Sequence, residues 1–226
     1  MSLVSLPSDN SKLINEIFDL LFTHFGPQKW WPGETPFEIC VGAILTQNTS
    51  WSNVEKAIAN LKNAEVLDFE SMRALETAKL ADLIRPAGYF NIKAKRLKSF
   101  LDGIALRFGA FENLQKIKTE NLREELLAIN GIGPETADSI VLYAFNRSSF
   151  VIDAYTKRIL VRHRLMDAEA DYYRMKEFFE HHLEINVTLF NEYHALIVMT
   201  GKKYCSKSKP KCDICPLNKI NGGPQI

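Results

Sequence analysis

Hydrophobic residues recur at helical spacing along most of the chain. Between residues 10 and 26 apolar side chains repeat every three or four positions, and Gly26-Pro27 ends the pattern. Residues 36–49 form a more uniformly apolar run that ends in polar residues. The same spacing predicts two helices within 53–83, one over 92–108, and others over 154–165, 171–187 and 189–200. Strand patterns are nearly absent, so we predict an all-α fold.

One interruption of this pattern has the composition of a tight hairpin between two helices. An apolar-periodic run stops at Asn130, Gly131-Ile132-Gly133 follows, and Pro134 opens a new helix. Proline suits a first helical position because it has no N–H to lose, and the two glycines permit a tight turn and a close backbone approach. Free N–H groups at the start of the second helix can hold an anion, and phosphate is the obvious candidate.

Asp153 stands twenty residues after Gly133, between three apolar residues and the next helical pattern. The simplest interpretation is that it caps the N-terminus of a helix. A carboxylate near a phosphate-binding hairpin also fits a position against the sugar of the nucleotide that the hairpin holds.

Together these residues resemble the helix-hairpin-helix DNA glycosylases, the superfamily of endonuclease III. The signature is the hairpin followed at this distance by an aspartate, although the linker here is not rich in Gly and Pro. The resemblance covers roughly residues 15–216. It implies two helical lobes with a central cleft: a six-helix barrel over 34–147, and a second lobe of 1–33 plus 148–226 with Asp153 at the cleft.

Two further segments carry the resemblance and imply DNA contacts. Residues 45–49, LTQNT, resemble the L-x-Q-x-T segment whose glutamine fills the gap left by a flipped nucleotide, a role that falls on Gln47. Residues 88–95, GYFNIKAK, resemble a loop whose bulky residue wedges into the opposite strand. Tyr89 takes the wedge position, with Asn91 and Lys93 in the same motif; alternatively, Tyr89 and Phe90 only cover the core.

Size and charge add modest constraints. The 226 residues are 46% hydrophobic, enough for one large domain or two small ones with a core. The net charge of +1 says nothing about nucleic acid, but basic residues cluster at 93–98 and 202–211. These clusters are either solvated helix faces or DNA contacts. There is no long apolar run and no leader pattern, so we expect neither membrane insertion nor secretion. We also expect a monomer and, if the protein is prokaryotic, a location in the cytoplasm at the nucleoid.

Three of the four cysteines are clustered near the end of the sequence. Cys205, Cys212 and Cys215 have the spacing of the [4Fe–4S] loop of endonuclease III, but Asn221 stands where that pattern has a fourth cysteine. We predict a [4Fe–4S] cluster with an incomplete ligand set; zinc or no metal are the alternatives. Cys40 has no cysteine neighbour and is expected in the core.

The resemblance also implies a reaction. Cleavage of an N-glycosidic bond passes through an oxocarbenium ion, which a carboxylate at Asp153 would stabilise while activating water. Bifunctional members carry a lysine two residues past the second hairpin glycine, and that position here is Glu135. A carboxylate cannot form a Schiff base, so we predict a monofunctional enzyme that uses water.

Tryptophans suggest the base pocket. The pair Trp30-Trp31 and the downstream Trp51 resemble the 3-methyladenine DNA glycosylases of this branch, in which two aromatics sandwich an alkylated purine. Those relatives lack the cysteine loop. We assign the sandwich to Trp30 and Trp51, because a cationic purine gains cation–π attraction there; otherwise these side chains only cover the core. Gly42 occupies the position of a glutamate in adenine-excising relatives.

Double-stranded DNA with a damaged base is therefore the expected partner. Two other functions stay open. One is a lyase for oxidised pyrimidines that uses another lysine, such as Lys202. The other is a DNA-binding module without catalysis.

Overall fold

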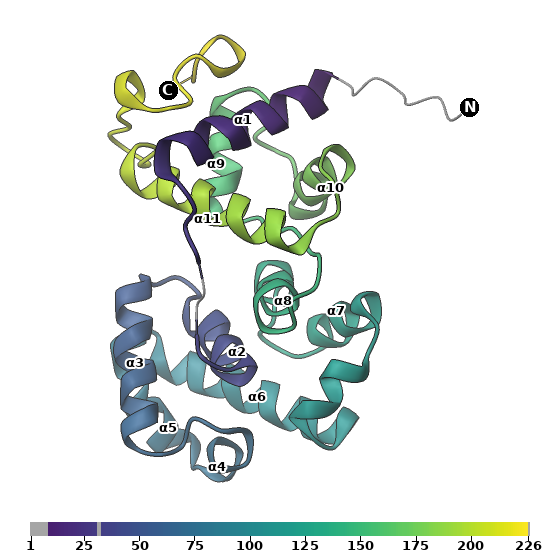
Figure 1. The fold of residues 1–226 in the computed structure, drawn as a ribbon. Coiled ribbons are helices and arrows are strands. Elements are labelled where there is room, and N and C mark those ends of the chain that lie inside the picture. Colours follow the sequence, from purple (N-terminus) through teal and green to yellow (C-terminus); the bar gives the residue numbers. More distant parts are fainter. Residues whose placement is uncertain (1–8, 31–32, 226) are drawn as a thin grey trace, which may run out of the picture. The chain divides into compact units, whose positions relative to one another are not determined.

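The computed structural model describes residues 9–30 and 33–225, which contain many helices and no strand (Figure 1). The predicted all-α class is confirmed. The chain divides into two compact units, Trp31–Arg147 on one side and Met1–Trp30 with Ser148–Ile226 on the other. Within the described ranges, no helix is long and apolar enough to cross a membrane.

The unit of residues 31–147, called here the hairpin unit, is built around α2. Its helices are α2 (Pro36–Leu45), α3 (Trp51–Asn63), α4 (Phe69–Ala74), α5 (Thr77–Leu83), α6 (Phe90–Phe108), α7 (Thr119–Leu127) and α8 (Pro134–Ser139), with a π-helical turn at Ile140–Ala144. Two 3₁₀ segments, Arg85–Ala87 and Phe111–Lys116, connect them. α2 packs against α3, α6, α8 and the π-helical turn, which explains its uniformly apolar sequence.

The second helix expected within 53–83 is divided into α4 and α5. Leu75 and Glu76 are extended, and this ends α4 early. The carbonyls of Arg73 and Leu75 accept hydrogen bonds from Lys98 Nζ on α6, with 3.1 Å to Leu75 O. Lys98, a donor from another helix, thus satisfies the carbonyls at the break between α4 and α5. The hydrophobic pattern of residues 53–83 does not reveal such a donor.

The other unit, called here the aspartate unit, packs four helices around aromatic side chains. They are α1 (Asp9–Phe25), α9 (Ala154–Arg162), α10 (Tyr172–His182) and α11 (Val187–Lys203), followed by 3₁₀ turns at Cys212–Ile214 and Ile220–Gly222. Phe150 stacks on Phe179 with ring centroids 4.0 Å apart, and both rings meet Tyr193 edge-on. Tyr193 also donates a hydrogen bond to Ile14 O at 2.8 Å, which ties α11 to α1.

Gly201 lets α9 and α11 approach closely. A Cβ at this position would overlap the ring of Tyr155, the second residue of α9. Asp153 directly precedes α9 and His194 lies on α11, so the close contact of these two helices brings the two residues near each other.

Candidate active site

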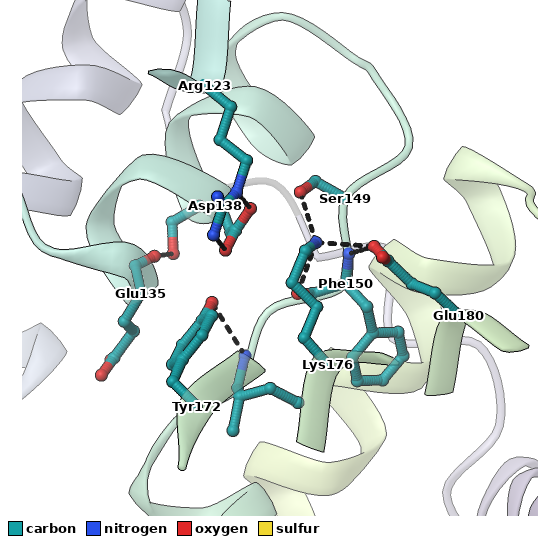
Figure 2. A network of polar contacts seen from close by, with 10 residues as sticks. Arg123, Glu135, Asp138, Ser149, Phe150, Tyr172, Lys176 and Glu180 are labelled. Carbon is teal, nitrogen blue, oxygen red and sulfur yellow. Dashed lines mark hydrogen bonds and ion pairs between the residues drawn. The ribbon is translucent and has the colours of Figure 1, made fainter. Parts of the chain in front are cut away.

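The predicted hairpin forms between α7 and α8. Gly131 has φ +90°, a left-handed conformation that favours glycine, and a Cβ there would overlap the Arg96 side chain. Gly133 is the N-cap of α8 and Pro134 its first residue, as the sequence predicts. The buried carboxylate of Asp138 accepts two hydrogen bonds from Arg123, at 2.7 and 3.0 Å, and so joins α8 to α7 (Figure 2). The hairpin is therefore braced by a bidentate ion pair.

Gln47 is hydrogen-bonded directly to this hairpin. Its Nε2 donates to Gly131 O at 3.0 Å and to Thr136 Oγ1 at 2.9 Å, and its Oε1 accepts from Arg96. Arg96, on α6, therefore touches both the glutamine and the place where a Gly131 side chain would lie. Hydrogen bonds thus connect Gln47, two residues after the end of α2, with Arg96 on α6 and with the hairpin and α8.

The loop at 88–95 divides into exposed and buried residues. Tyr89 is 69% exposed and left-handed (φ 47°), directly before α6, and Asn91 is also exposed. Lys93, in contrast, is 1% exposed and donates from Nζ to Ala87 O at 2.7 Å. Burial, and then the charge of Arg96, lower the pKa of Lys93 to about 8. The expected contact of Lys93 with DNA does not fit this burial; Lys95, two residues later, is exposed.

The tryptophans of the expected pocket lie in different units. Trp51, the first residue of α3, places its indole against Gly42 of α2, where an added Cβ would lie 3.3 Å from the ring. Gly42 thus provides the clearance for the Trp51 ring. Trp30 is half-buried in the aspartate unit, with Lys202 Nζ 5.4 Å from its ring centroid. Trp31 lies outside the described residues.

Asp153 is held in one orientation by its neighbours. It is the N-cap of α9, and Oδ1 accepts from Thr156 N at 2.7 Å and from Thr156 Oγ1 at 2.8 Å. Oδ2 lies 3.8 Å from Nε2 of the buried His194, and the Asp153 side chain is 13% exposed. Burial lowers the pKa of His194, against the opposing effect of Asp153. A neutral imidazole therefore faces the carboxylate at neutral pH.

Glu135 occupies the first turn of α8 in the hairpin unit and is exposed. Its backbone carbonyl accepts a hydrogen bond from Ser139 Oγ at 2.7 Å. Because Glu135 stands two residues after the second hairpin glycine and no lysine lies in this turn, the turn has no amine that could attack a sugar carbon.

The cysteine loop is held by arginines of α9. Cys205, Cys212 and Cys215 line one small cavity together with Arg162, which donates to Cys205 Sγ at 3.2 Å and to Ser206 O at 2.8 Å. Burial raises the pKa of Cys212 and of Cys215. The three thiols therefore line the same cavity.

The donor set does not complete a four-ligand metal centre. Among the described residues, no three His, Cys, Asp or Glu side chains lie close enough to hold one metal ion. Asn221, at the position expected for a fourth ligand, donates from its side-chain Nδ2 to His163 O at 2.7 Å, and its backbone carbonyl accepts a hydrogen bond from Arg164. The side-chain amide is therefore already hydrogen-bonded within the protein.

Comparison with known proteins identifies the chain. A family profile described as HhH-GPD superfamily base excision DNA repair protein matches residues 41–184. The chain belongs to this superfamily. The resemblance predicted from the sequence is confirmed. A protein of Methanocaldococcus jannaschii named "Putative DNA repair glycosylase MJ1434" is 49% identical over 211 residues, which cover 92% of this chain and 96% of that protein.

Solved structures of superfamily members agree with this assignment. The Helicobacter pylori 3-methyladenine DNA glycosylase MagIII, bound to 1,N6-ethenoadenine, is 31% identical with a TM-score of 0.73, over 87% of this chain and 98% of that one. An endonuclease III–DNA complex has a TM-score of 0.80 at 18% identity, over 94% of this chain and 96% of that one. At that identity the second likeness shows the shared fold alone.

Several residues at these sites were not predicted from the sequence. They are Arg96, which bonds Gln47; Thr156 and His194, which surround the Asp153 carboxylate; and Lys176 and Glu180, which hold the segment before Asp153. Thr156 has a recognisable signal, because a hydroxyl three residues after an aspartate can join an N-cap. His194 lies 41 residues from Asp153 on an apolar helix, where a buried core histidine is the ordinary interpretation.

Proposed function

We propose that the chain is a monofunctional DNA glycosylase that hydrolyses the N-glycosidic bond of an alkylated purine, such as 3-methyladenine, flipped out of double-stranded DNA. The observation that carries this proposal is the Asp153 carboxylate, largely buried and fixed by two hydrogen bonds from Thr156. A preorganised negative charge stabilises a developing oxocarbenium ion without a reorganisation cost at the moment of reaction. In this proposal Asp153 also orients the attacking water.

The hairpin unit has the groups needed to hold the DNA. Gly131, Ile132 and Gly133 would bring the α8 N-terminus to a phosphate, and the N–H groups there carry the positive end of the helix dipole. Gln47 would fill the gap left by the flipped nucleotide, and the exposed Tyr89 would wedge between bases with Asn91 beside it. Residues 34–147 would thus be the DNA-holding barrel, with residues 1–33 and 148–226 as the lobe that supplies Asp153.

The substrate class rests on the tryptophans. N3- and N7-alkylated purines are cationic, and stacking a cation on tryptophan is worth about 0.5–2 kcal/mol, most when the pair is desolvated. Trp51 has its indole clear of α2 because position 42 is glycine. The 31% identity to a 3-methyladenine glycosylase supports the same class. Glycosidic bonds of such purines are already weak, so one carboxylate and water suffice.

A lesion panel tests the proposal. Duplexes with 3-methyladenine, 7-methylguanine, an oxidised pyrimidine or no lesion are incubated with the protein and then split into samples with and without hot alkali. We expect base release from alkylated duplexes and strand breaks only after alkali. Excision of the oxidised pyrimidine alone would refute the substrate class and leave the role of Asp153 standing.

Borohydride distinguishes the lyase alternative. Lys202, which is exposed and has its Nζ 5.4 Å from the Trp30 ring centroid, is one amine that a bifunctional mechanism could use. Under the monofunctional proposal borohydride traps no protein–DNA adduct, because water is the nucleophile. A trapped adduct that disappears in Lys202→Met would establish the lyase instead. DNA binding without release of any base would leave only the binding-module alternative.

A further inference from the structure

The segment directly before Asp153 is buried but belongs to no helix. Residues 149–152 have no regular secondary structure, and Ser149, Phe150, Val151 and Ile152 are each less than 5% exposed. Buried backbone N–H and C=O groups need hydrogen-bond partners, and a segment outside helices and sheets does not receive them from a regular hydrogen-bond pattern. The position of this segment sets the position of the Asp153 backbone.

Side chains from one face of α10 supply partners. Tyr172, Lys176 and Glu180 follow one another at intervals of four, so they lie along one face of the helix. Glu180 Oε1 accepts from Phe150 N at 2.9 Å, and Tyr172 Oη lies 3.4 Å from Ile152 N. Lys176 Nζ donates to Ser149 Oγ at 2.7 Å and to Phe150 O at 3.4 Å (Figure 2). Three successive turns of α10 thus hold residues 149, 150 and 152.

The two charged members also bind each other. Lys176 Nζ lies 2.6 Å from Glu180 Oε1, with side chains 10% and 28% exposed. Burying a charge pair costs solvation, and well-packed apolar residues often stabilise a protein as much or more. This segment already has an apolar contact with α10, because the Phe150 ring stacks on Phe179. An apolar contact is non-directional, however, and does not fix where the backbone lies along the helix.

We infer that Lys176 and Glu180 are positioning residues for Asp153: from α10 they fix the backbone of residues 149–150 and so hold the catalytic carboxylate in register. This inference rests on the proposed function. Lys176 and Glu180 reach the segment three and four residues before Asp153, and Thr156 binds the carboxylate three residues after it. A displacement of about 1 Å in a reacting group can cost on the order of 100-fold in rate.

The double variant Lys176→Met/Glu180→Gln tests this role separately from stability. It replaces both members of the Lys176–Glu180 ion pair, the methionine keeps the stem of Lys176, and the glutamine still offers Phe150 N an acceptor. We expect it to melt closer to wild type than either single variant, in which one member of this pair keeps its charge while the other loses it. Single-turnover excision from methylated duplex, with enzyme in excess, should be slower by roughly 10- to 100-fold.

The affinity for DNA distinguishes a positioning role from a purely structural one, because a structural role would lower the affinity together with the excision rate. Binding to a duplex with an abasic-site analogue should stay within about 2-fold of wild type, because the hairpin is untouched and a 2-fold change is only about 0.4 kcal/mol. The matched control is Arg174→Met, on the same helix with a side chain 64% exposed. It should excise at the wild-type rate. A double variant with the wild-type excision rate would overturn the inference, and so would parallel losses of rate, affinity and melting temperature.

Asp153→Asn in the same assay separates this inference from the proposed function. If wild type releases no base, or Asp153→Asn is as active as wild type, the proposed function fails and the positioning role fails with it. If activity depends on Asp153 but the double variant is as fast as wild type, only the positioning role fails.

Discussion

The hairpin and the segment around Asp153 are held in place in different ways. The hairpin is specified by neighbours in sequence: Gly131 makes the turn, Gly133 caps α8 and Pro134 begins it. Asp153 is oriented through side chains of three helices: Thr156 on α9, Lys176 and Glu180 on α10, and His194 on α11. Holding a phosphate needs backbone N–H groups, which every helix start offers. Stabilising one developing charge needs a single carboxylate in a defined place, and local sequence alone does not provide that.

Asp153→Asn should have the largest effect on catalysis. Asparagine caps a helix as well as aspartate, so the α9 N-terminus is retained while the charge is lost. We expect single-turnover excision to fall by about 100- to 1000-fold, the range seen when one preorganised electrostatic group is removed. The control is Asp171→Asn, which caps α10 through a 2.8 Å bond to Arg174 N and should remain fully active. Equal losses in both variants would mean that the loss is a general effect of removing a carboxylate charge at a helix N-terminus and not a property of the Asp153 site.

Trp51→Ala should come next. Stacking of a base on an aromatic side chain is worth about 1–3 kcal/mol, which corresponds to a loss of roughly 5- to 150-fold in excision of 3-methyladenine. Trp51→Phe keeps a ring and should lose less. Affinity for undamaged duplex should not change in either variant. Full activity of a folded Trp51→Ala protein on alkylated DNA would remove this residue from the pocket.

The two hairpin glycines should respond differently to alanine. Gly131→Ala forces a left-handed L-residue and an overlap with Arg96, so we expect a lower melting temperature and about 10-fold weaker DNA binding, equivalent to about 1.4 kcal/mol. Gly133 has φ −90° and nothing within 4 Å of an added Cβ. Gly133→Ala should therefore melt like wild type. Any loss of affinity in that variant would report a close approach of DNA, which sharpens the contrast with the Asp153 segment.

Lys93 and Lys95 form a matched pair of substitutions within one turn of α6. Lys95→Met should weaken binding across all sequences and reduce the slope of log affinity against log salt by about 1. Lys93→Met should leave that slope unchanged, because the buried ammonium is bound to Ala87 O. A fall in slope for Lys93→Met alone would show that the loop rearranges on DNA.

Lys93 also gives the folded protein a pH dependence. Its folded pKa of about 8 is lower than the value of about 10.4 in an unfolded chain. Between these values the unfolded chain binds more protons, so the free energy of unfolding should rise from this group as pH increases from about 8 to about 10.4. Denaturant unfolding across this range should show a smaller rise in Lys93→Met.

The smallest effect on activity is expected for the cysteine loop. With three thiols and Asn221 bonded to His163 O, anaerobically purified protein should hold any iron weakly and lose it in air. Asn221→Cys, which adds a fourth thiol, should retain more iron per chain, measured by metal analysis and visible absorption. Stoichiometric zinc in colourless wild-type protein would contradict the iron expectation. Excision should persist after chelation, because no proposed step uses this loop.

Much of the architecture was predictable because it is local. Most of the helices, the Gly-Ile-Gly turn and the proline after it follow from spacing and from residue types with restricted backbones. The differences from the sequence predictions have tertiary causes. One predicted helix is split where Lys98 Nζ donates hydrogen bonds to the carbonyls of Arg73 and Leu75, and Lys93 is buried although a lysine in a basic run normally faces solvent.

The sequence by itself determined the all-α class, the superfamily, the hairpin and the identity of the candidate carboxylate. Each of these depends on short-range periodicity or on conformational preferences of single residues. Only the tertiary structure decided how that carboxylate is held, that Gln47 is bonded to the hairpin, and that Gly42 makes room for Trp51. Those facts depend on which side chains meet across helices, and residues 41 or 84 positions apart carry no mark of their contact until the chain has folded.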